Sequence, residues 1–233
     1  RQRRGVVVIE DEPTLSGLQL ADSLLPVGND SNSYALEQFG QTERVEDAAD
    51  LQALLESYLH GQVGPAELVA LRAAHTAVRA EDVDALVAAD RHLHASTLPK
   101  EFRTSATRSG ERLCELWREI RDVPILDRYS ERSTPAQYPV VLGAVTASEA
   151  IGQRRACMLH AHSFLSDMLG AAQRLLRLGA TEAQQIRSDI QPAVSEAVAD
   201  SADRTLEEMA PFAPLIELQS THHERAQRRL FMS

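Results

Sequence analysis

Lysine and aromatic residues are scarce in this chain of 233 residues. Aromatic residues make up 4% of the sequence, so a hydrophobic core must consist mainly of Leu, Val and Ala, which suits helix-on-helix packing. The only lysine is Lys100, and it follows Pro99. A phosphate-binding loop ends in Gly-Lys, so such a loop is excluded, and we expect no nucleotide hydrolysis by the chain itself.

Other sequence features are also absent or rare. The sequence has no run of eighteen apolar residues, which excludes a membrane-spanning helix of the usual kind. The formal net charge of −10 argues against binding to nucleic acid. The two cysteines, Cys114 and Cys157, fall on apolar helix faces, so we expect two buried free thiols rather than a disulfide. The apolar patch at 6–9 is too short for a signal peptide, and we expect a cytoplasmic protein.

Apolar residues recur at helical spacing from residue 154 to residue 178, without an interrupting proline. This spacing predicts a long amphipathic helix, and its wide apolar face is typical of the central helix of a bundle. The apolar face consists of Cys157, Met158, Ala161, Phe164, Leu165, Met168, Leu169, Ala172, Leu175 and Leu176. Together with the shorter helical patterns around it, this helix predicts an all-α, single-domain helical bundle around a long central helix.

Proline, glycine and capping residues set the ends of the other predicted helices. Residues 1–13 are predicted to form a flexible arm, and the first helix should begin near Thr14 or Ser16. A polar loop then follows at 29–33. Further on, Gly61 should close one helix, and Pro65 should sit in the first turn of the next.

The second half of the chain contains one ambiguous segment. Residues 140–151 are rich in β-branched side chains and resemble a strand, but Pro139 stands where a helix would start, so we predict a helix. Pro192 should break or kink the chain, and residues 193–209 are predicted to form a final full helix. The main domain is therefore expected over 14–214, with a C-terminal tail over 215–233.

Two pairs of histidines are candidate metal ligands. His92 and His94 are two residues apart on a predicted helix, as are His160 and His162, so each pair points in directions about 200° apart. One metal ion could not take both members of a pair, and we interpret them as ordinary surface or core histidines. Asp90 and His94 are four apart and could share a face, which we interpret as an ordinary helix-surface contact. We predict no catalytic residue, metal ligand or cofactor site.

The C-terminal tail has two features of its own. His222 and His223 lie in it, where geometry excludes metal binding less strictly than on a helix. Leu230 and Phe231 are large and apolar and follow an arginine cluster that ends at Arg229. An apolar pair in this position suggests a tail that docks on a partner, although a solvated chain end is the simpler interpretation.

Several motifs, in order along nearly the whole chain, resemble those of the UreF urease accessory proteins. The matching residues are Leu24, Leu25, Pro26, Val27, Gly28, Ser31, Ser33, Tyr34, Leu36 and Glu37, then Glu101, Phe102, Arg103, Ser105 and Gly110, then Tyr138, Pro139, Val140, Val141, Gly143 and Ala144, then His162, Ser163, Phe164 and Leu165, and finally Ser220, His223, Glu224, Arg229, Leu230, Phe231 and Ser233.

The resemblance implies an all-α accessory protein that is not an enzyme and forms a homodimer. It implies binding to a UreD/UreH-type accessory protein and to the nickel-carrying GTPase UreG, so that nickel reaches apo-urease. It also implies that the matching C-terminal residues, Ser220, His223, Glu224, Arg229, Leu230, Phe231 and Ser233, bind a partner. The alternative is a helical small-ligand-binding or enzymatic bundle, which requires polar groups on the inner face of the central helix, where only His162 lies near the edge of the apolar stripe.

Overall fold

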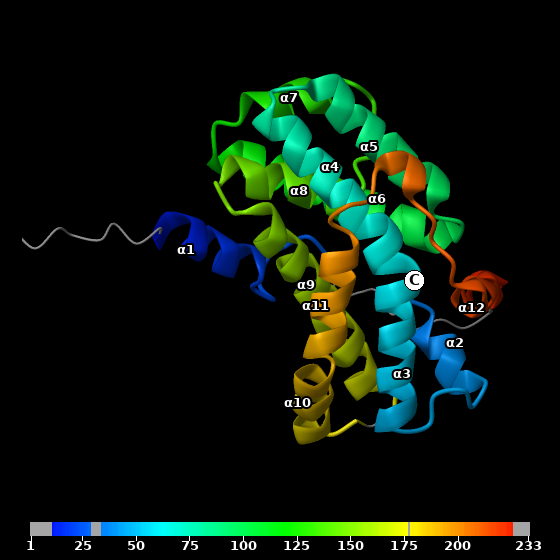
Figure 1. Cartoon of the computed structure of the whole chain (residues 1–233). Coiled ribbons are helices and arrows are strands. Elements are labelled where there is room, and N and C mark those ends of the chain that lie inside the picture. Colours follow the sequence, from blue (N-terminus) through cyan, green and yellow to red (C-terminus); the bar gives the residue numbers. More distant parts are fainter. Residues whose placement is uncertain (1–10, 29–33, 177, 226–233) are drawn as a thin grey trace, which may run out of the picture.

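The computed structural model describes residues 11–28, 34–176 and 178–225, with side chains as far as residue 221. Within these ranges the regular structure is entirely helical, which confirms the predicted all-α bundle (Figure 1). In chain order the elements are α1 (Asp11–Leu20), α2 (Leu36–Gln41), α3 (Ala48–Tyr58), the π-helix η2 (Leu59–Glu67), α4 (Leu68–Arg79), α5 (Val83–Ser96), α6 (Lys100–Ile120), α7 (Pro124–Ser130), α8 (Tyr138–Ser148), α9 (Gln153–Leu175), α10 (Ala180–Asp189), α11 (Gln191–Asp200), the 3-10 helix η3 (Leu206–Glu208) and α12 (Pro214–Arg225).

The predicted central helix is α9. It covers Gln153–Leu175, close to the predicted range of 154–178. It contacts α1, α2, α4, α8, α10 and α11, as expected of a helix in the middle of a bundle. Most of the predicted apolar stripe is buried, including Phe164, Leu165, Met168 and Leu169. The hydrophobic periodicity of the sequence therefore identified the inner face of this helix correctly.

The most completely enclosed element is α8, the segment whose composition resembles a strand. It is a helix, as predicted, with Pro139 in its first turn, and every residue from Tyr138 to Ala147 is buried. A helix that is apolar all round is stable only when neighbours cover all of its surface, and α4 and α6 provide much of that cover. A Cβ on Gly143 would lie 2.4 Å from the carbonyl oxygen of Leu71, so α8 and α4 approach each other too closely for any side chain there.

Residues 48–79 form one continuous rod, which corrects the prediction that Gly61 ends one helix and Pro65 starts another. The rod runs through α3, η2 and α4 without a break. Pro65 has no N–H to donate to the carbonyl of Gly61, four residues earlier, so an α-helical turn cannot close there. The π-helical turn accommodates the proline, and the Gly61 oxygen accepts a hydrogen bond from the Phe212 N–H at 2.8 Å instead.

The C-terminal part differs from the prediction in two places. Pro192 breaks the chain as expected, because it stands in the first turn of α11. The expected full helix over 193–209 is wrong, since α11 ends at Asp200 and only the short η3 follows. The predicted tail begins with α12, which packs against α2, so the tail is not loose over the residues of this helix with described side chains (Figure 1).

At the other end of the chain, α1 projects from the body (Figure 1). It begins at Asp11, three residues earlier than the predicted start at Thr14, with Asp11 and Glu12 in the first turn, where the helix dipole favours negative charge. Ser16 Oγ donates a hydrogen bond to Glu149 Oε2 at 2.5 Å, and Trp117 Nε1–H donates to Glu149 Oε1 at 3.1 Å. The carboxylate of Glu149 thus fixes α1 to α6.

Candidate partner-binding site

The described part of the C-terminal tail has a buried side and an exposed side. Pro214 stands in the first position of α12, where its missing N–H costs nothing. Ile216 and Ser220 are buried, whereas the side chains of Leu215 and Leu218 are 43% and 51% exposed. Leu215 and Leu218 are three residues apart and therefore lie on one face of the helix. This face of α12 is therefore apolar and exposed, whereas the face that carries Ile216 and Ser220 packs inwards.

Phe212, on the segment before α12, is also exposed. Its side chain is 78% exposed, although its backbone is fixed by the hydrogen bond to the Gly61 oxygen. An aromatic ring that is exposed on a fixed backbone is well suited to binding, because little conformational freedom remains to be lost. We refer to Phe212, Leu215 and Leu218 as the C-terminal apolar surface.

The predicted partner-binding residues are only partly within the described structure. The side chain of Ser220 is fully buried, and its hydroxyl has no hydrogen-bond partner among the described residues. His223 and Glu224 belong to α12, but their side chains lie outside the description. The remaining four, Arg229, Leu230, Phe231 and Ser233, lie outside the described residues altogether.

A buried polar cluster lies where η2 meets α9. His160 Nε2 and Glu67 Oε2 are 2.7 Å apart, and Gln62 Nε2 donates to Glu67 Oε1 at 3.2 Å. Burial, together with the nearby Glu67 carboxylate, raises the pKa of Tyr58. A cavity of about 30 Å³ adjoins His160, which is far smaller than a typical ligand pocket. The cluster is suited to structural hydrogen bonding rather than to binding a substrate.

The histidine pairs point apart, as their spacing predicted. His160 contacts η2, whereas His162, two residues later, receives a hydrogen bond from Arg187 of α10 at 3.3 Å. Burial, and then the positive charge of Arg187, lower the pKa of His162, which keeps its ring nitrogen available as an acceptor. Among the described residues, no group of three or more His, Cys, Asp and Glu side chains could hold a metal ion.

Asp90 has a role that the sequence did not reveal. It is fully buried, and its carboxylate accepts the backbone N–H groups of Ala136 and Gln137 at 2.8 and 2.7 Å. His94 Nδ1 lies 3.2 Å from Gln137 Nε2. The interpretation of Asp90 and His94 as a helix-surface contact is therefore wrong. Both side chains hold the segment before α8, and the spacing along α5 gave no signal of that distant partner.

Both cysteines are buried and free, as predicted. Burial raises the pKa of Cys114 and of Cys157 to about 11, so neither thiol is ionised near neutral pH. None of the described helices is both long and apolar enough to cross a membrane.

Comparison with known proteins places this arrangement in a family. A sequence model of the UreF family matches residues 45–191. The chain belongs to the UreF family. It is 32% identical over 220 residues to urease accessory protein UreF 1 of Brucella melitensis biotype 1, covering 93% of this chain and 91% of that protein.

Other relatives agree. Urease accessory protein UreF 2 of Brucella abortus is 32% identical over 220 residues, covering 93% of this chain and 90% of that protein. Urease accessory protein UreF of Yersinia pseudotuberculosis serotype IB is 29% identical over 218 residues, covering 92% of this chain and 95% of that protein. The similarity therefore extends over at least 92% of this chain and 90% of each of these relatives.

Proposed function

We propose that this UreF protein is a non-enzymatic scaffold of urease maturation. In this proposal it binds a UreD/UreH-type accessory protein and, with it, the GTPase UreG, so that nickel is delivered to apo-urease. It acts in the cytoplasm as a homodimer. Nickel is the cargo of the assembly rather than a resident cofactor of this chain.

The C-terminal apolar surface is the observation that supports partner binding most strongly. Phe212, Leu215 and Leu218 are large, apolar and exposed beside the start of the tail. The tail then continues to Arg229 and Phe231, which match the terminal motif of the family. Phenylalanine and arginine are both enriched in protein–protein interfaces, and arginine is also enriched among the residues that contribute most to binding.

The first experiment tests assembly with purified components. The chain is mixed with the UreD/UreH-type protein, with and without the GTPase, and the mixtures are separated by size-exclusion chromatography. Co-elution of all three is expected. Separate elution of each component would contradict the proposal, and GTP turnover by the isolated chain would contradict its non-enzymatic character.

The second experiment tests the tail. Arg229→Ala and Phe231→Ala should leave the melting temperature nearly unchanged and should weaken assembly, with a matching loss of urease activation. The control is Arg128→Ala, since Arg128 is an exposed arginine on α7. If the tail only covers the protein's own core, both tail variants should instead melt at a lower temperature and lose binding only as far as they unfold.

A further inference from the structure

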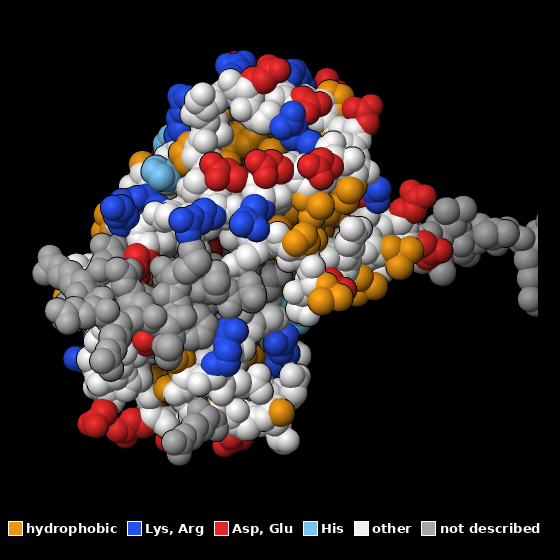
Figure 2. Space-filling view, turned by 180° about the vertical axis from the view of Figure 1, so that it is seen from behind, with side chains coloured by type: hydrophobic (Ala, Val, Ile, Leu, Met, Phe, Trp, Pro, Cys, Tyr) orange, Lys and Arg blue, Asp and Glu red, His pale blue; other side chains and the backbone are white. Residues whose placement is uncertain are grey.

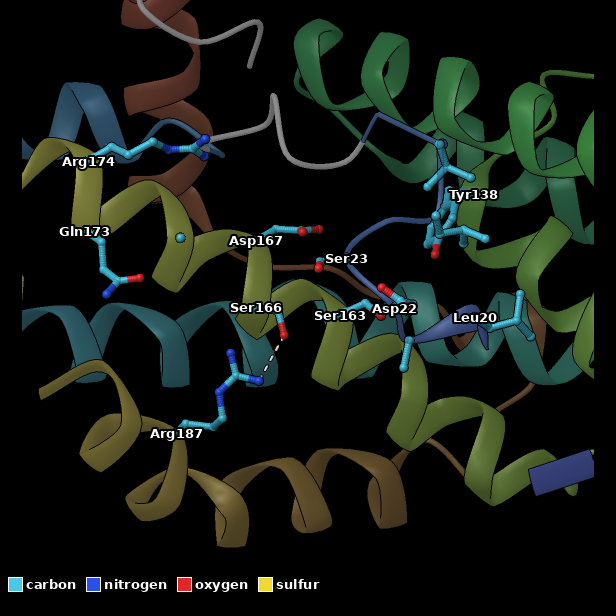
Figure 3. A pocket seen from close by; sticks show the side chains of 14 residues that line it. Leu20, Asp22, Ser23, Tyr138, Ser163, Ser166, Asp167, Gln173, Arg174 and Arg187 are labelled. Carbon is cyan, nitrogen blue, oxygen red and sulfur yellow. Dashed lines mark hydrogen bonds between the residues drawn. The ribbon is translucent and has the colours of Figure 1, made fainter. Parts of the chain in front are cut away.

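A second candidate site is a pocket beside α9. It has a volume of about 520 Å³, within the range of binding pockets, and is formed by α9, α10 and the segment 20–27 after α1 (Figure 3). Its polar wall is built from α9 and α10, and its apolar wall from Leu20, Leu25 and Val27. Gly170 of α9 also lines it, and a Cβ added there would meet no atom within 4 Å, so the wall of the pocket is open at this point.

Arg187 supplies a guanidinium group to this pocket. Its Nη1 donates to Ser166 Oγ at 3.0 Å and to His162 Nε2 at 3.3 Å, and Figure 3 shows the first of these bonds. Its Nε is buried and has no hydrogen-bond partner among the described residues. The guanidinium is therefore held at one corner, while the edge that carries Nε and Nη2 has no acceptor in the described structure.

This free edge determines which chemical group fits. Two parallel N–H donors on one edge of a guanidinium match the two oxygens of a carboxylate. A buried N–H without an acceptor also costs free energy in the unbound protein. A carboxylate that draws Arg187 a short way into the pocket removes this cost. Asp22 and Asp167 also line the pocket but lie on the other side of α9 from Arg187 in Figure 3, and the Asp22 carboxylate accepts the Leu24 N–H at 2.8 Å.

The surroundings of the pocket favour a protein over a small molecule. Leu24 stands between the pocket residues Ser23 and Leu25, and its side chain is 85% exposed. Leu15 and Leu18 on α1 are 62% and 64% exposed, and Figure 2 shows hydrophobic side chains gathered where the α1 side of the molecule projects.

The position of α1 prevents these leucines from turning inwards. Ser16 is bonded to Glu149, and Leu20 is buried, so α1 is anchored with Leu15 and Leu18 facing outwards. A ligand the size of the pocket would leave them in water, whereas a protein surface would cover them together with the pocket.

We propose that this pocket is a second docking site, which receives an acidic side chain of the UreD/UreH-type partner, with apolar partner residues covering Leu15, Leu18 and Leu24. The inference rests on the proposed function and names the chemistry of one contact within it. The acidic side chain pairs with the free edge of Arg187, and the apolar contacts add buried area to the same interface.

The test uses the full chain and the purified UreD/UreH-type protein. Arg187→Gln should weaken binding about 10- to 100-fold, the usual effect of removing a hydrogen bond to a charged group. Arg187→Lys should recover part of the loss, because it keeps the charge without the fork. Leu24→Ser should also weaken binding. Arg128→Gln is the control and should bind as the unmodified chain does. All four variants should keep the unmodified melting temperature.

Four results would overturn the inference. Binding by Arg187→Gln that equals the unmodified chain would overturn it and leave the proposed function standing, whereas no binding by the unmodified chain would overturn both. If free glutarate binds the unmodified chain but not Arg187→Gln, while both bind the partner equally well, the pocket is assigned to small carboxylates. A shift from dimer to monomer in Arg187→Gln, again with partner affinity unchanged, would assign it to a second copy of the chain.

Discussion

His160 and Glu67 meet inside the bundle although they are 93 positions apart in the sequence. Their side chains are 6% and 14% exposed, and Nδ1 of His160 is buried without a hydrogen-bond partner in the described structure. The contact joins the π-helix to the middle of α9. Removing the contact between His160 and Glu67 should therefore destabilise the whole bundle rather than one helix.

His160→Ala should lower the free energy of unfolding by about 1–3 kcal/mol, because it leaves the Glu67 carboxylate with a lost partner in a buried site. The measurement is urea denaturation at constant pH. His162→Ala, two residues away and only partly covered, is the control and should change stability by less than about 0.5 kcal/mol. Equal effects of the two substitutions would show that the buried contact contributes nothing.

The stability of the fold should depend on pH through His75. Burial lowers the pKa of His75 below its ordinary value of 6.5, with a further contribution from Arg79 and Arg72 and an opposing one from the hydrogen bond to the Ile151 carbonyl. The unfolded chain therefore binds a proton at a higher pH than the folded chain does. The neutral form of His75 therefore contributes to the free energy of unfolding. This contribution is complete above about pH 6.5 and is lost as the pH falls from there towards the folded-state pKa.

This dependence can be isolated with His75→Gln, which keeps a donor near the Ile151 carbonyl but does not titrate. Unfolding free energies measured between pH 7.5 and pH 5 should fall less steeply for the variant than for the unmodified chain. Carboxylates contribute equally to both proteins, so only the difference in slope reports on His75. Parallel curves would contradict the expectation.

Two glycines in neighbouring helices should respond to alanine in opposite directions. At Gly143 the new methyl group would lie 2.4 Å from the Leu71 oxygen, so Gly143→Ala should destabilise the fold by about 1–3 kcal/mol or more. At Gly170 nothing lies within 4 Å, so Gly170→Ala should stabilise it by about 0.4–1 kcal/mol through reduced freedom of the unfolded chain. Thermal denaturation of both variants measures the contrast, and a shift of the same sign would refute it.

Two substitutions at Phe212 should separate its backbone from its side chain. Phe212→Pro removes the N–H that bonds the Gly61 oxygen and should cost about 1–3 kcal/mol of stability. Phe212→Ala keeps that N–H and removes an exposed ring, so it should leave stability nearly unchanged and weaken partner binding. If Phe212→Ala binds the UreD/UreH-type protein normally, the C-terminal apolar surface is not part of that interface.

The local features of this fold were predictable from the sequence, because residues close together in the chain determine them. The spacing of Phe164, Leu165, Met168 and Leu169 identified the inner face of α9, and Pro139 identified the start of α8. Hydrophobic periodicity records which residues face the core, and it is preserved whichever helices supply that core.

Features that depend on distant partners were not predictable in this way. The sequence around Gly61 and Pro65 reads as the end of one helix and the start of another, because the acceptor freed by Pro65 is satisfied by Phe212 from the far end of the chain. Asp90 and Gln137 meet only in the folded protein. At the candidate site, the terminal motif marks Arg229 and Phe231, but no periodic signal in the tail predicts what they contact.

The π-helix also makes the rod of residues 48–79 sensitive to its own length. A π-turn takes up more residues than an α-turn, so η2 changes the rotational phase between α3, which faces α10, and α4, which faces α8 and α5. Deleting one residue from η2 would turn α4 by about 100° relative to α3. Gly143 would then no longer meet Leu71, although neither residue had changed. Between Tyr58 and Leu68, the number of residues is therefore constrained as well as their identity.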